Sequence, residues 1–359
     1  MTHLNRRHLL HAALGTAALQ FAPRVVFAQA ATERRFVFII QRGAADGLDT
    51  LVPYADPGYA RLRGALAVDA SAAHRLDGSF ALHPALAETA QLFAAGQVLP
   101  VHAVASPYRD RSHFDGQNVL ETGGTAPYAL KDGWLNRLLT LLPRAGKEAI
   151  ALAPTVPMAL RGPVDVASYA PSALPQASDD LMLRVSQLYA ADAQLHALWT
   201  AAMDARGIAS AGGEMDARAR QDPAGTGRMA ANFLSQPGGP RIAMIETGGW
   251  DTHTGQAGRL AAQLRSLDAL IAALRTGLGP AWDRTTVLVA TEFGRTAAAN
   301  GTGGTDHGTG SAALLLGGAV RGGRVLADWP GLAPANLYEG RDLQPTLGLD
   351  ALVAASVGW

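Results

Sequence analysis

Continuous apolar runs alternate with stretches of helical spacing along most of the chain. The apolar runs have the length and composition of strands buried on both faces, and they lie at residues 35–40, 98–104, 149–152, 241–246, 285–291 and 312–316. Helical spacing is found at residues 84–95, from about 112–114 onward, and at 134–142, 255–278 and 346–357. Alternating strands and helices require crossover connections, which predicts an α/β fold with a mostly parallel sheet sandwiched between helices.

Residues 163–240 differ from the rest of the chain. They are rich in alanine, with helical patterns around 179–204 and 216–234 that are joined by glycine-rich stretches. We interpret them as a helical insertion without a cluster of chemically active side chains. The prediction is therefore one α/β domain over residues 31–359.

The first thirty residues have the features of an export signal. Residues 1–30 contain Arg6, Arg7 and Arg24, no acidic residue, and an apolar run of residues 9–21 that is shorter than the roughly 20 residues needed to span a bilayer. The pair Arg6-Arg7, followed by residues 8–10, looks like a twin-arginine signal, with an ordinary Sec signal as the alternative. The twin-arginine route carries folded proteins, often after a metal or cofactor has been loaded. We therefore expect a periplasmic or secreted protein without a stable membrane anchor.

Charge and cysteine content exclude several classes of function. The 359 residues include 30 Lys+Arg and 30 Asp+Glu, and removal of residues 1–30 with their three arginines leaves 27 basic against 30 acidic residues, a net of −3. Because the arginines form no basic stripe, a nucleic-acid partner is not expected. The chain has no cysteine, which excludes disulfides, thiol catalysis and cysteine-ligated zinc.

Polar residues gather just after four of the predicted strands. Asp46 follows the first strand, residues 110–113 follow the second, residues 247–253 follow the strand that ends at 246, and residues 292–295 and 304–308 follow the strand that ends at 291. Ligands of such sheets bind beyond the carboxyl ends of the strands. Carboxylates mixed with imidazoles and no sulfur suit divalent metal, with zinc or manganese favoured over magnesium or calcium. The sequence therefore predicts a site for one or two ions.

The spacing of these side chains allows shared ligation. Asp251 and His253 are two residues apart, so both can face one ion from a loop but not from a regular helix. Asp306 and His307 are adjacent, and the glycines beside them permit the irregular backbone that would let both reach a metal. The candidate metal ligands are Asp46, Asp251, His253, Glu292, Asp306 and His307, and the candidate catalytic residues are Ser112, His113 and Arg295.

Ordinary structural roles are the alternative for each of these residues. Asp46-Gly47 is a common turn pair, and Ser112 is a suitable cap for the helix that follows it. Glu292 and Arg295 can form a structural ion pair at the end of a strand. The functional interpretation therefore depends on convergence of the strand ends, whereas four histidines without polar company are assigned structural roles: His74, His83, His102 and His196.

Seven motifs in a fixed order resemble one protein family. They are RGAADGLDTLVP (42–53), LHPAL (82–86), RSHFDGQNVLETG (111–123), GWLNRLL (133–139), ETGGWDTH (246–253), TEFGRT (291–296) and GGTDHGTG (303–310). This pattern resembles the DUF1501 family of exported, often twin-arginine-targeted proteins, which is placed in the alkaline phosphatase/sulfatase superfamily and has no settled activity. The resemblance implies a mostly parallel sheet between helices with a metal site at the strand ends.

The resemblance also implies roles by position. The first metal ligand, the nucleophile, the middle ligand pair, a later acidic ligand and the last histidine correspond in turn to Asp46, Ser112, Asp251 with His253, Glu292 and His307. This chain departs from the superfamily pattern because its middle pair is two residues apart instead of four and Glu292-Phe293 replaces an Asp-His. Without cysteine, a formylglycine nucleophile made from cysteine is excluded. Ser106 competes with Ser112 for the role of nucleophile.

The expected function is metal-dependent hydrolysis of a small anionic phosphate or sulfate ester. Ser112 at a helix N-terminus would attack, activated by a metal held partly by Asp46, while Arg295 or a second metal would hold the equatorial oxygens. Either His253 or His307 would bind metal and the other would protonate the leaving group. The main alternative is a non-catalytic secreted metal-binding or assembly protein that retains the fold. A metal-free serine hydrolase is disfavoured because the Gly-x-Ser-x-Gly motif is absent.

Overall fold

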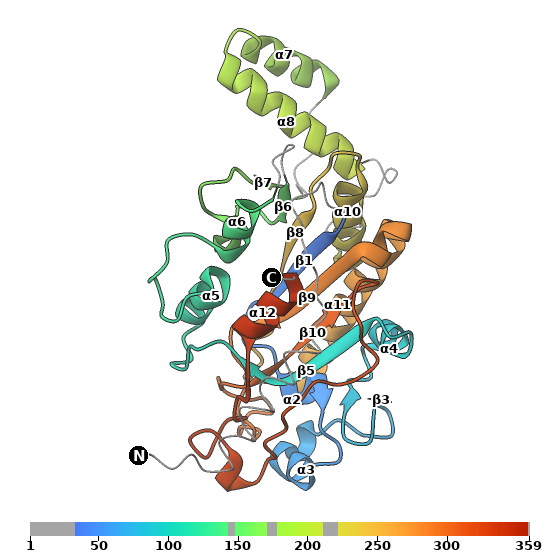
Figure 1. The fold of residues 1–359 in the computed structure, drawn as a ribbon, viewed down its shortest axis with the longest axis vertical. Coiled ribbons are helices and arrows are strands. Elements are labelled where there is room, and N and C mark those ends of the chain that lie inside the picture. Colours follow the sequence, from blue (N-terminus) through green and yellow to red (C-terminus); the bar gives the residue numbers. More distant parts are fainter. Residues whose placement is uncertain (1–32, 143–147, 171–177, 211–221, 358–359) are drawn as a thin grey trace, which may run out of the picture.

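A mostly parallel sheet of eight strands forms the centre of the protein in the computed structural model, which describes residues 33–142, 148–170, 178–210 and 222–357 (Figure 1). From one edge to the other the order is β11-β5-β10-β9-β1-β8-β6-β7. Strand β10 is antiparallel to both of its neighbours, and the other pairs are parallel. The strands are β1 (Arg35–Gln41), β5 (Val98–Ala105), β6 (Ala149–Leu152), β7 (Ala167–Ser168), β8 (Ile242–Thr247), β9 (Thr285–Thr291), β10 (Ser311–Leu316) and β11 (Leu347–Gly348). The predicted α/β fold is confirmed, whereas the predicted signal of residues 1–30 lies outside the described residues.

Helices cover both faces of the sheet, which explains the continuous apolar strands. Successive side chains of a strand point to opposite faces, so Val37 and Ile39 of β1 enter one core while Phe36, Phe38 and Ile40 enter the other. The first core is closed by α4 (Ala87–Ala94), α10 (Pro223–Ser235) and α11 (Gln256–Leu278), and the second by α5 (His113–Thr122), α6 (Trp134–Leu139) and α12 (Leu349–Val357).

The four-residue strand β6 was predicted, but the other short elements were not, because two to seven residues give little readable period. A small antiparallel sheet, with α2 and α3 beside it, lies near the loops that follow the main strands (Figure 1). The predicted helix at 346–357 begins only at Leu349, because residues 347–348 extend as β11 beside β5. The remaining elements are β2 (Leu51–Val52), β3 (His74–Arg75), β4 (Ala81–Leu82), α2 (Gly47–Thr50), α3 (Pro57–Arg63) and the 3₁₀ helices Gly64–Leu66, Met158–Leu160, Gly279–Arg284 and Pro334–Asn336.

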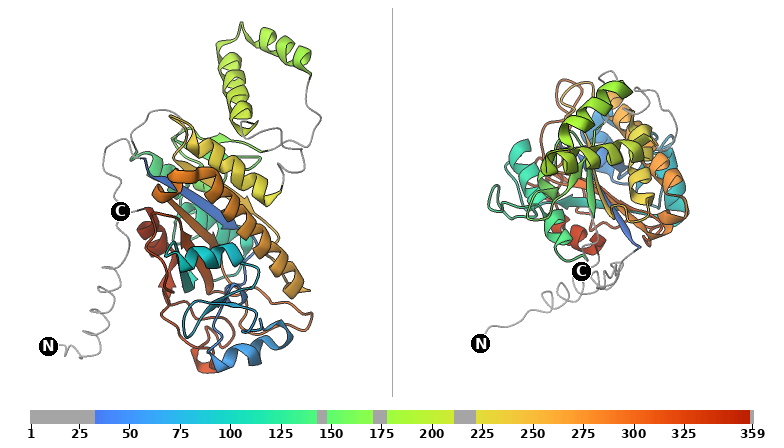
Figure 2. Two further views of the ribbon diagram at one scale, coloured as in Figure 1. Left: turned by 90° about the vertical axis from the view of Figure 1, so that its right-hand side faces the viewer. Right: turned by 90° about the horizontal axis from the view of Figure 1, so that it is seen from above.

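Residues 163–240 divide between an arm and the main body. Helices α7 (Asp179–Tyr189) and α8 (Ala193–Ser210) project away from the sheet (Figure 2), whereas α10 packs closely along α11. A Cβ atom on Gly227 of α10 would lie 2.3 Å from the carbonyl oxygen of Leu270, so this contact requires glycine. Part of the predicted insertion thus belongs to the helical layer of the domain. Of the helical pattern predicted at 216–234, residues 216–221 lie outside the described residues. No helix within the described ranges is both long and apolar enough to cross a membrane.

Candidate metal centre

The predicted polar loops meet at one edge of the sheet. Strands β5 and β9 run in the same direction, since both are antiparallel to β10, and β1 is parallel to β8 and β9. The loops after β1, β5, β8 and β9 therefore leave from one edge, where the sequence places its polar residues. Helix α5 begins in this region at His113.

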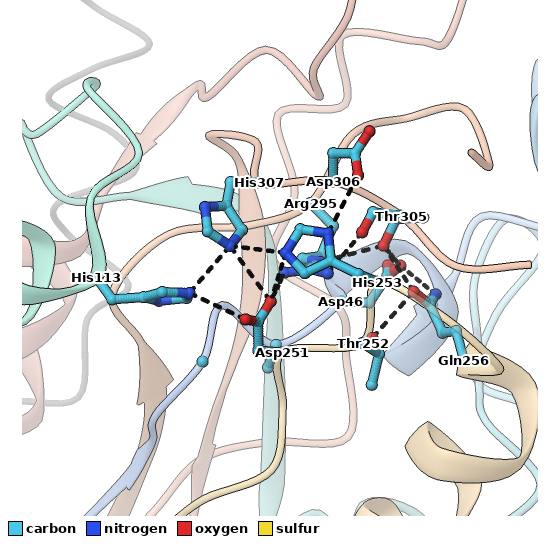
Figure 3. A network of polar contacts seen from close by, with 12 residues as sticks. Asp46, His113, Asp251, Thr252, His253, Gln256, Arg295, Thr305, Asp306 and His307 are labelled. Carbon is cyan, nitrogen blue, oxygen red and sulfur yellow. Dashed lines mark hydrogen bonds and ion pairs between the residues drawn. The ribbon is translucent and has the colours of Figure 1, made fainter. Parts of the chain in front are cut away.

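Three imidazoles turn their Nε2 atoms toward one another (Figure 3). Nε2 of His307 lies 3.0 Å from Nε2 of His113 and 3.0 Å from Nε2 of His253. Asp251 lies beside them, with Oδ1 3.0 Å from Nε2 of His253 and 3.3 Å from Nε2 of His307, and Oδ2 3.5 Å from Nε2 of His113. Within the described part of the chain, His113, Asp251 and His307 form a group whose ligand atoms all lie within 4.8 Å of one another.

Glu292 holds His113 from behind. Nδ1 of His113 donates to Oε1 of the buried Glu292 at 2.8 Å, and the same oxygen accepts from the Gly43 amide at 2.9 Å and from Gln117 Nε2 at 3.2 Å. Burial alone would raise the pKa of Glu292, but the hydrogen bond from His113 and the further donors lower it. Glu292 was predicted as a metal ligand, and the structure instead places it behind an imidazole, where it fixes the ring and its tautomer.

The other two imidazoles are held in the same way. Nδ1 of His253 donates to Oδ1 of Asp306 at 3.1 Å, and Nδ1 of His307 donates to the backbone carbonyl of Arg111 at 3.1 Å. Arg111 has a φ of 61°, a left-handed conformation that a side chain rarely adopts and that often marks functional sites. Asp306, also predicted as a ligand, therefore orients His253. With every Nδ1 donating outward, the Nε2 lone pairs face the centre.

This arrangement fits a divalent cation. Two imidazole nitrogens whose lone pairs face each other at 3.0 Å repel unless a proton or a cation lies between them. Nitrogen ligands at 2.0–2.1 Å from a tetrahedral zinc lie about 3.3 Å apart, which is close to these separations. The side chains of His113 and Asp251 are 25% and 42% exposed, so a bound cation would be open to a substrate.

The charge states of His307 and Asp251 suit cation binding. The hydrogen bond to Glu292 raises the pKa of His113, so a cation that binds this ring must displace a proton from it. Burial, followed by the neighbouring His113, lowers the pKa of His307 and favours its neutral form. Burial alone would raise the pKa of Asp251, but the hydrogen bond and charge of Arg295 lower it. A neutral imidazole and an ionised carboxylate are the forms that ligate metal.

Arg295 positions Asp251. Its buried guanidinium donates from Nη1 to Asp251 Oδ1 at 2.6 Å, from Nε to the Thr305 hydroxyl at 3.1 Å and from Nη2 to the Thr305 carbonyl at 2.6 Å. The prediction that Arg295 holds substrate oxygens is therefore corrected, because its donors face the protein. The structural ion pair between Glu292 and Arg295, which was the alternative interpretation of these residues, does not form: Arg295 pairs with Asp251 and Glu292 with His113.

Asp46 does not join the imidazoles. Its buried carboxylate caps α2 by accepting from the amides of Leu48 and Asp49, pairs with both Nη atoms of Arg63, and accepts from Gln256 Nε2 at 2.6 Å. Burial would raise the pKa of Asp46, but the charge of Arg63 lowers it. The predicted role of Asp46 as a metal ligand is corrected for this structure, because these donors occupy its oxygens.

Removal of the buried charge of Arg63 is expected to destabilise the fold strongly. The Arg63→Met variant would leave the carboxylates of Asp46 and Asp49 buried without their cation, which costs about 3–5 kcal/mol. Urea unfolding followed by circular dichroism measures this loss. Arg61→Met is the matched control on the same helix, because Arg61 is exposed and should change stability by less than about 0.5 kcal/mol. Equal stability of the two variants would contradict the assignment.

Ser112 stands at the start of α5, directly before His113. Its side chain makes no capping hydrogen bond, so the alternative role as a helix cap is not observed. Its competitor Ser106 is buried, and the hydroxyl of Ser106 accepts from the Tyr108 amide at 3.3 Å. Ser106 also lines an apolar cavity of about 300 Å³ that reaches α6 and α12. Ser112 therefore remains the predicted nucleophile.

Sequence reasoning missed the residues that connect the two parts of this edge. Gln256 donates to Asp46 and Asp49, and it accepts from the Thr305 hydroxyl at 2.6 Å. The positions of Thr305 and Gln256 in the sequence could have pointed to them, since Thr305 lies within the motif GGTDHGTG and Gln256 is the third residue after His253. Arg63 carries none, because it stands outside all seven motifs.

Two motif glycines allow the loops to approach one another. A Cβ atom on Gly43, whose φ is +120°, would lie 2.6 Å from the Asp251 amide. A Cβ atom on Gly304 would lie 2.2 Å from the carbonyl oxygen of His253. Both contacts place backbone where a side chain would stand, so these glycines allow the close approach of the loops that carry Asp251 and His253.

Solved structures similar to this chain share little sequence with it. The C-terminal periplasmic domain of EcEptC from Escherichia coli, in complex with Zn, is 9% identical, with 80% of this chain and 74% of that chain covered and a TM-score of 0.41. A putative sulfatase from Bacteroides thetaiotaomicron is 10% identical, with coverage of 91% and 71% and a TM-score of 0.40. The phosphonate monoester hydrolase of Agrobacterium radiobacter is 12% identical, with coverage of 82% and 70% and a TM-score of 0.33.

The sequence comparison is specific for one family. No curated protein matches the chain. Residues 95–356 match the family described as protein of unknown function (DUF1501), and this range includes five of the seven motifs and every residue of the imidazole cluster. Because the match covers more than half of the sequence, the chain belongs to the DUF1501 family.

Proposed function

We propose that this protein is an exported, metal-dependent hydrolase of phosphate or sulfate esters. His113, Asp251 and His307 would hold a divalent cation, zinc or manganese. The observation that carries the proposal is the inward orientation of the Nε2 atoms, with each Nδ1 committed to an oxygen behind it. A bound divalent cation supplies Lewis acidity, which polarises an ester oxygen and favours the ionised form of a nearby hydroxyl.

The residues around the cluster divide the remaining work. Ser112 would attack the phosphorus or sulfur atom from the residue next to His113, forming an Oγ–P or Oγ–S bond as the ester oxygen departs. His253, whose ring is oriented by Asp306 and whose side chain is 41% exposed, would accept the Ser112 hydroxyl proton at Nε2 and then pass it to the departing oxygen. Water would then release the phosphate or sulfate and restore the Ser112 hydroxyl. Arg295 keeps Asp251 ionised and in place.

One observation favours a second candidate, a secreted metal-binding protein without ester turnover. The arginines beside the cluster are paired with carboxylates: Arg111 contacts Asp342 and Glu339, and Arg295 contacts Asp251. A substrate anion therefore meets few uncommitted cations at the cluster itself. Metal binding without hydrolysis would follow from this neutralised charge.

Metal content and turnover together distinguish these candidates. Full-length protein exported to the periplasm and purified without chelator would be analysed for metals, then supplied with phosphomonoesters, phosphodiesters and sulfate esters. Bound metal with hydrolysis that EDTA abolishes is the expected result. Bound metal without hydrolysis of any ester selects the second candidate, and absence of metal contradicts both.

The carboxylate behind His113 should tune metal affinity. Glu292→Gln removes the charge that holds the Nδ1 proton, and loss of such a partner lowers metal affinity about 10- to 100-fold. Competition with a chromophoric chelator measures the change. Asp306→Asn is the matched control, since it alters the partner of His253, which lies outside the three proposed ligands. Asp306→Asn should slow turnover and change metal affinity by less than about threefold. Equal losses of affinity in the two variants would contradict this division of roles.

A further inference from the structure

A second cavity lies along α5, close to the imidazole cluster, because Gln117 both lines the cavity and donates to Glu292 behind His113. It has a volume of about 470 Å³ and is lined by Phe114, Gln117, Tyr128, Leu130, Lys131 and Arg161, among others. None of these residues belongs to the cluster described above.

Helix α5 connects this cavity to the cluster. His113 and Gln117 are four residues apart and therefore share a face of the helix. Gln117 donates to Glu292, the residue that holds His113, and it also lines the cavity. Phe114, the residue directly after His113, is part of the cavity wall. A molecule with its ester at the cluster can thus extend along α5 into this space.

The walls offer apolar surface to solvent. Phe114 is 81% exposed, Tyr128 is 55% exposed and Leu130 is 37% exposed. Large apolar side chains gathered around one hollow are typical of binding sites. Two aromatic rings among them suit an aromatic or other flat apolar group.

The same cavity carries cations without ion pairs. Across the described ranges, neither Lys131 nor Arg161 has an ion pair, and the contact found for Arg161 is from Nε to the Val156 carbonyl at 2.8 Å. The acid on this wall, Glu121, is buried, pairs at 2.9 Å with Arg42, which also pairs with Glu246, and accepts from the Ala159 amide at 3.0 Å. The cavity is therefore positive, in contrast to the arginines beside the cluster.

We propose that this cavity binds the distal part of the substrate, an apolar and preferably aromatic group that carries its own negative charge. The inference rests on the proposed function for the position of the ester. Phe114 and Tyr128 contact the apolar group, while Lys131 and Arg161 contact the distal anion. The substrate class is accordingly an amphiphilic ester with a second acidic group, and not a minimal phosphate or sulfate ester.

Binding of naphthalene-2-sulfonate tests this assignment without turnover. The compound combines a flat apolar body with one anion and has no ester bond. Calorimetric titration of the full chain in EDTA should show binding, because the cavity residues are not metal ligands. Phe114→Ala and Lys131→Ala should each weaken it at least about fivefold. Leu188→Ala and Arg321→Ala, at exposed positions elsewhere, should leave it unchanged.

The outcomes separate this inference from the proposed function. The cavity assignment is overturned if naphthalene-2-sulfonate does not bind the wild-type chain, or if Phe114→Ala and Lys131→Ala bind it as tightly as the wild type does. Either result counts even if esters are hydrolysed. Cavity-dependent binding together with failure of hydrolysis supports the site and rejects only the activity. Where hydrolysis occurs, Phe114→Ala should raise KM for 6-phosphonooxy-2-naphthoate, which carries a distal carboxylate, whereas the control Leu188→Ala should leave that KM unchanged. An unchanged KM in Phe114→Ala also overturns the inference.

Discussion

Replacement of His307 with alanine is expected to abolish metal binding and turnover together. Nε2 of His307 lies at the centre of the cluster, 3.0 Å from Nε2 of both other imidazoles and 3.3 Å from Asp251 Oδ1. Its loss leaves one imidazole and one carboxylate of the proposed ligand set, too few for a stable site. We expect metal affinity to fall at least about 1,000-fold, measured by elemental analysis after dialysis and by chelator competition.

His196→Ala is the matched control for effects of a histidine-to-alanine substitution that do not involve the cluster. His196 is exposed on α8, and its removal should leave metal content and turnover at the wild-type level. The fold of both variants is checked by circular dichroism, because His307 also contributes its Nδ1 hydrogen bond to the Arg111 carbonyl. A folded His307→Ala protein that retains one tightly bound metal would end the proposal for this cluster.

The central strands were predictable because burial on both faces leaves a mark on the sequence. Residues 35–40 are apolar at nearly every position, and both sets of alternate side chains enter cores. Strand β9 was predicted with the bounds it has, Thr285–Thr291. In contrast, β7 and β11 contain two residues each and exist only because a neighbouring strand offers hydrogen bonds. Tertiary pairing of this kind has no local signal.

The location of the site was predictable for a topological reason. The carboxyl ends of parallel strands share an edge, so loops that are distant in sequence must meet there. The division of labour among the side chains was not predictable from residue type. Glu292 and Asp251 are both acids after strands, yet the first accepts an Nδ1 proton while the second faces the Nε2 atoms. Only the ring orientations of the histidines separate these roles.

Asp46 was expected to bind metal because of its position after the first strand, but its ion pair with Arg63, a residue outside the motifs, gives it a structural role. Its carboxylate is held by Arg63, which is buried beside it on α3, and also by Gln256 and the α2 amides. The two parts of the edge nevertheless remain connected. Asp46 contacts Gln256, Gln256 accepts from Thr305, and Thr305 contacts Arg295, which holds Asp251. We infer that the buried charges stabilise the loops from which the cluster is built.

Replacement of Ser112 with alanine is expected to lower ester turnover by about 10³- to 10⁶-fold, the range seen when a covalent nucleophile is removed. Metal content and stability should stay at the wild-type level, because the Ser112 side chain makes no capping hydrogen bond on α5. Turnover per bound metal, measured on the most rapidly hydrolysed ester, isolates the chemical step. A phosphoryl or sulfuryl adduct on the Ser112 peptide, detected by mass spectrometry after acid quench, would identify the bond that forms.

Ser106→Ala is the matched control, because it removes the same hydroxyl from the rival serine. Ser106 is buried and its hydroxyl already accepts a backbone hydrogen bond, so its loss should reduce stability slightly and leave turnover per bound metal unchanged. Loss of turnover in Ser106→Ala with retention in Ser112→Ala would move the nucleophile to the other serine. Wild-type turnover in both variants would eliminate a serine intermediate, since neither hydroxyl would then form a bond to the substrate, and direct attack by water would be the remaining route.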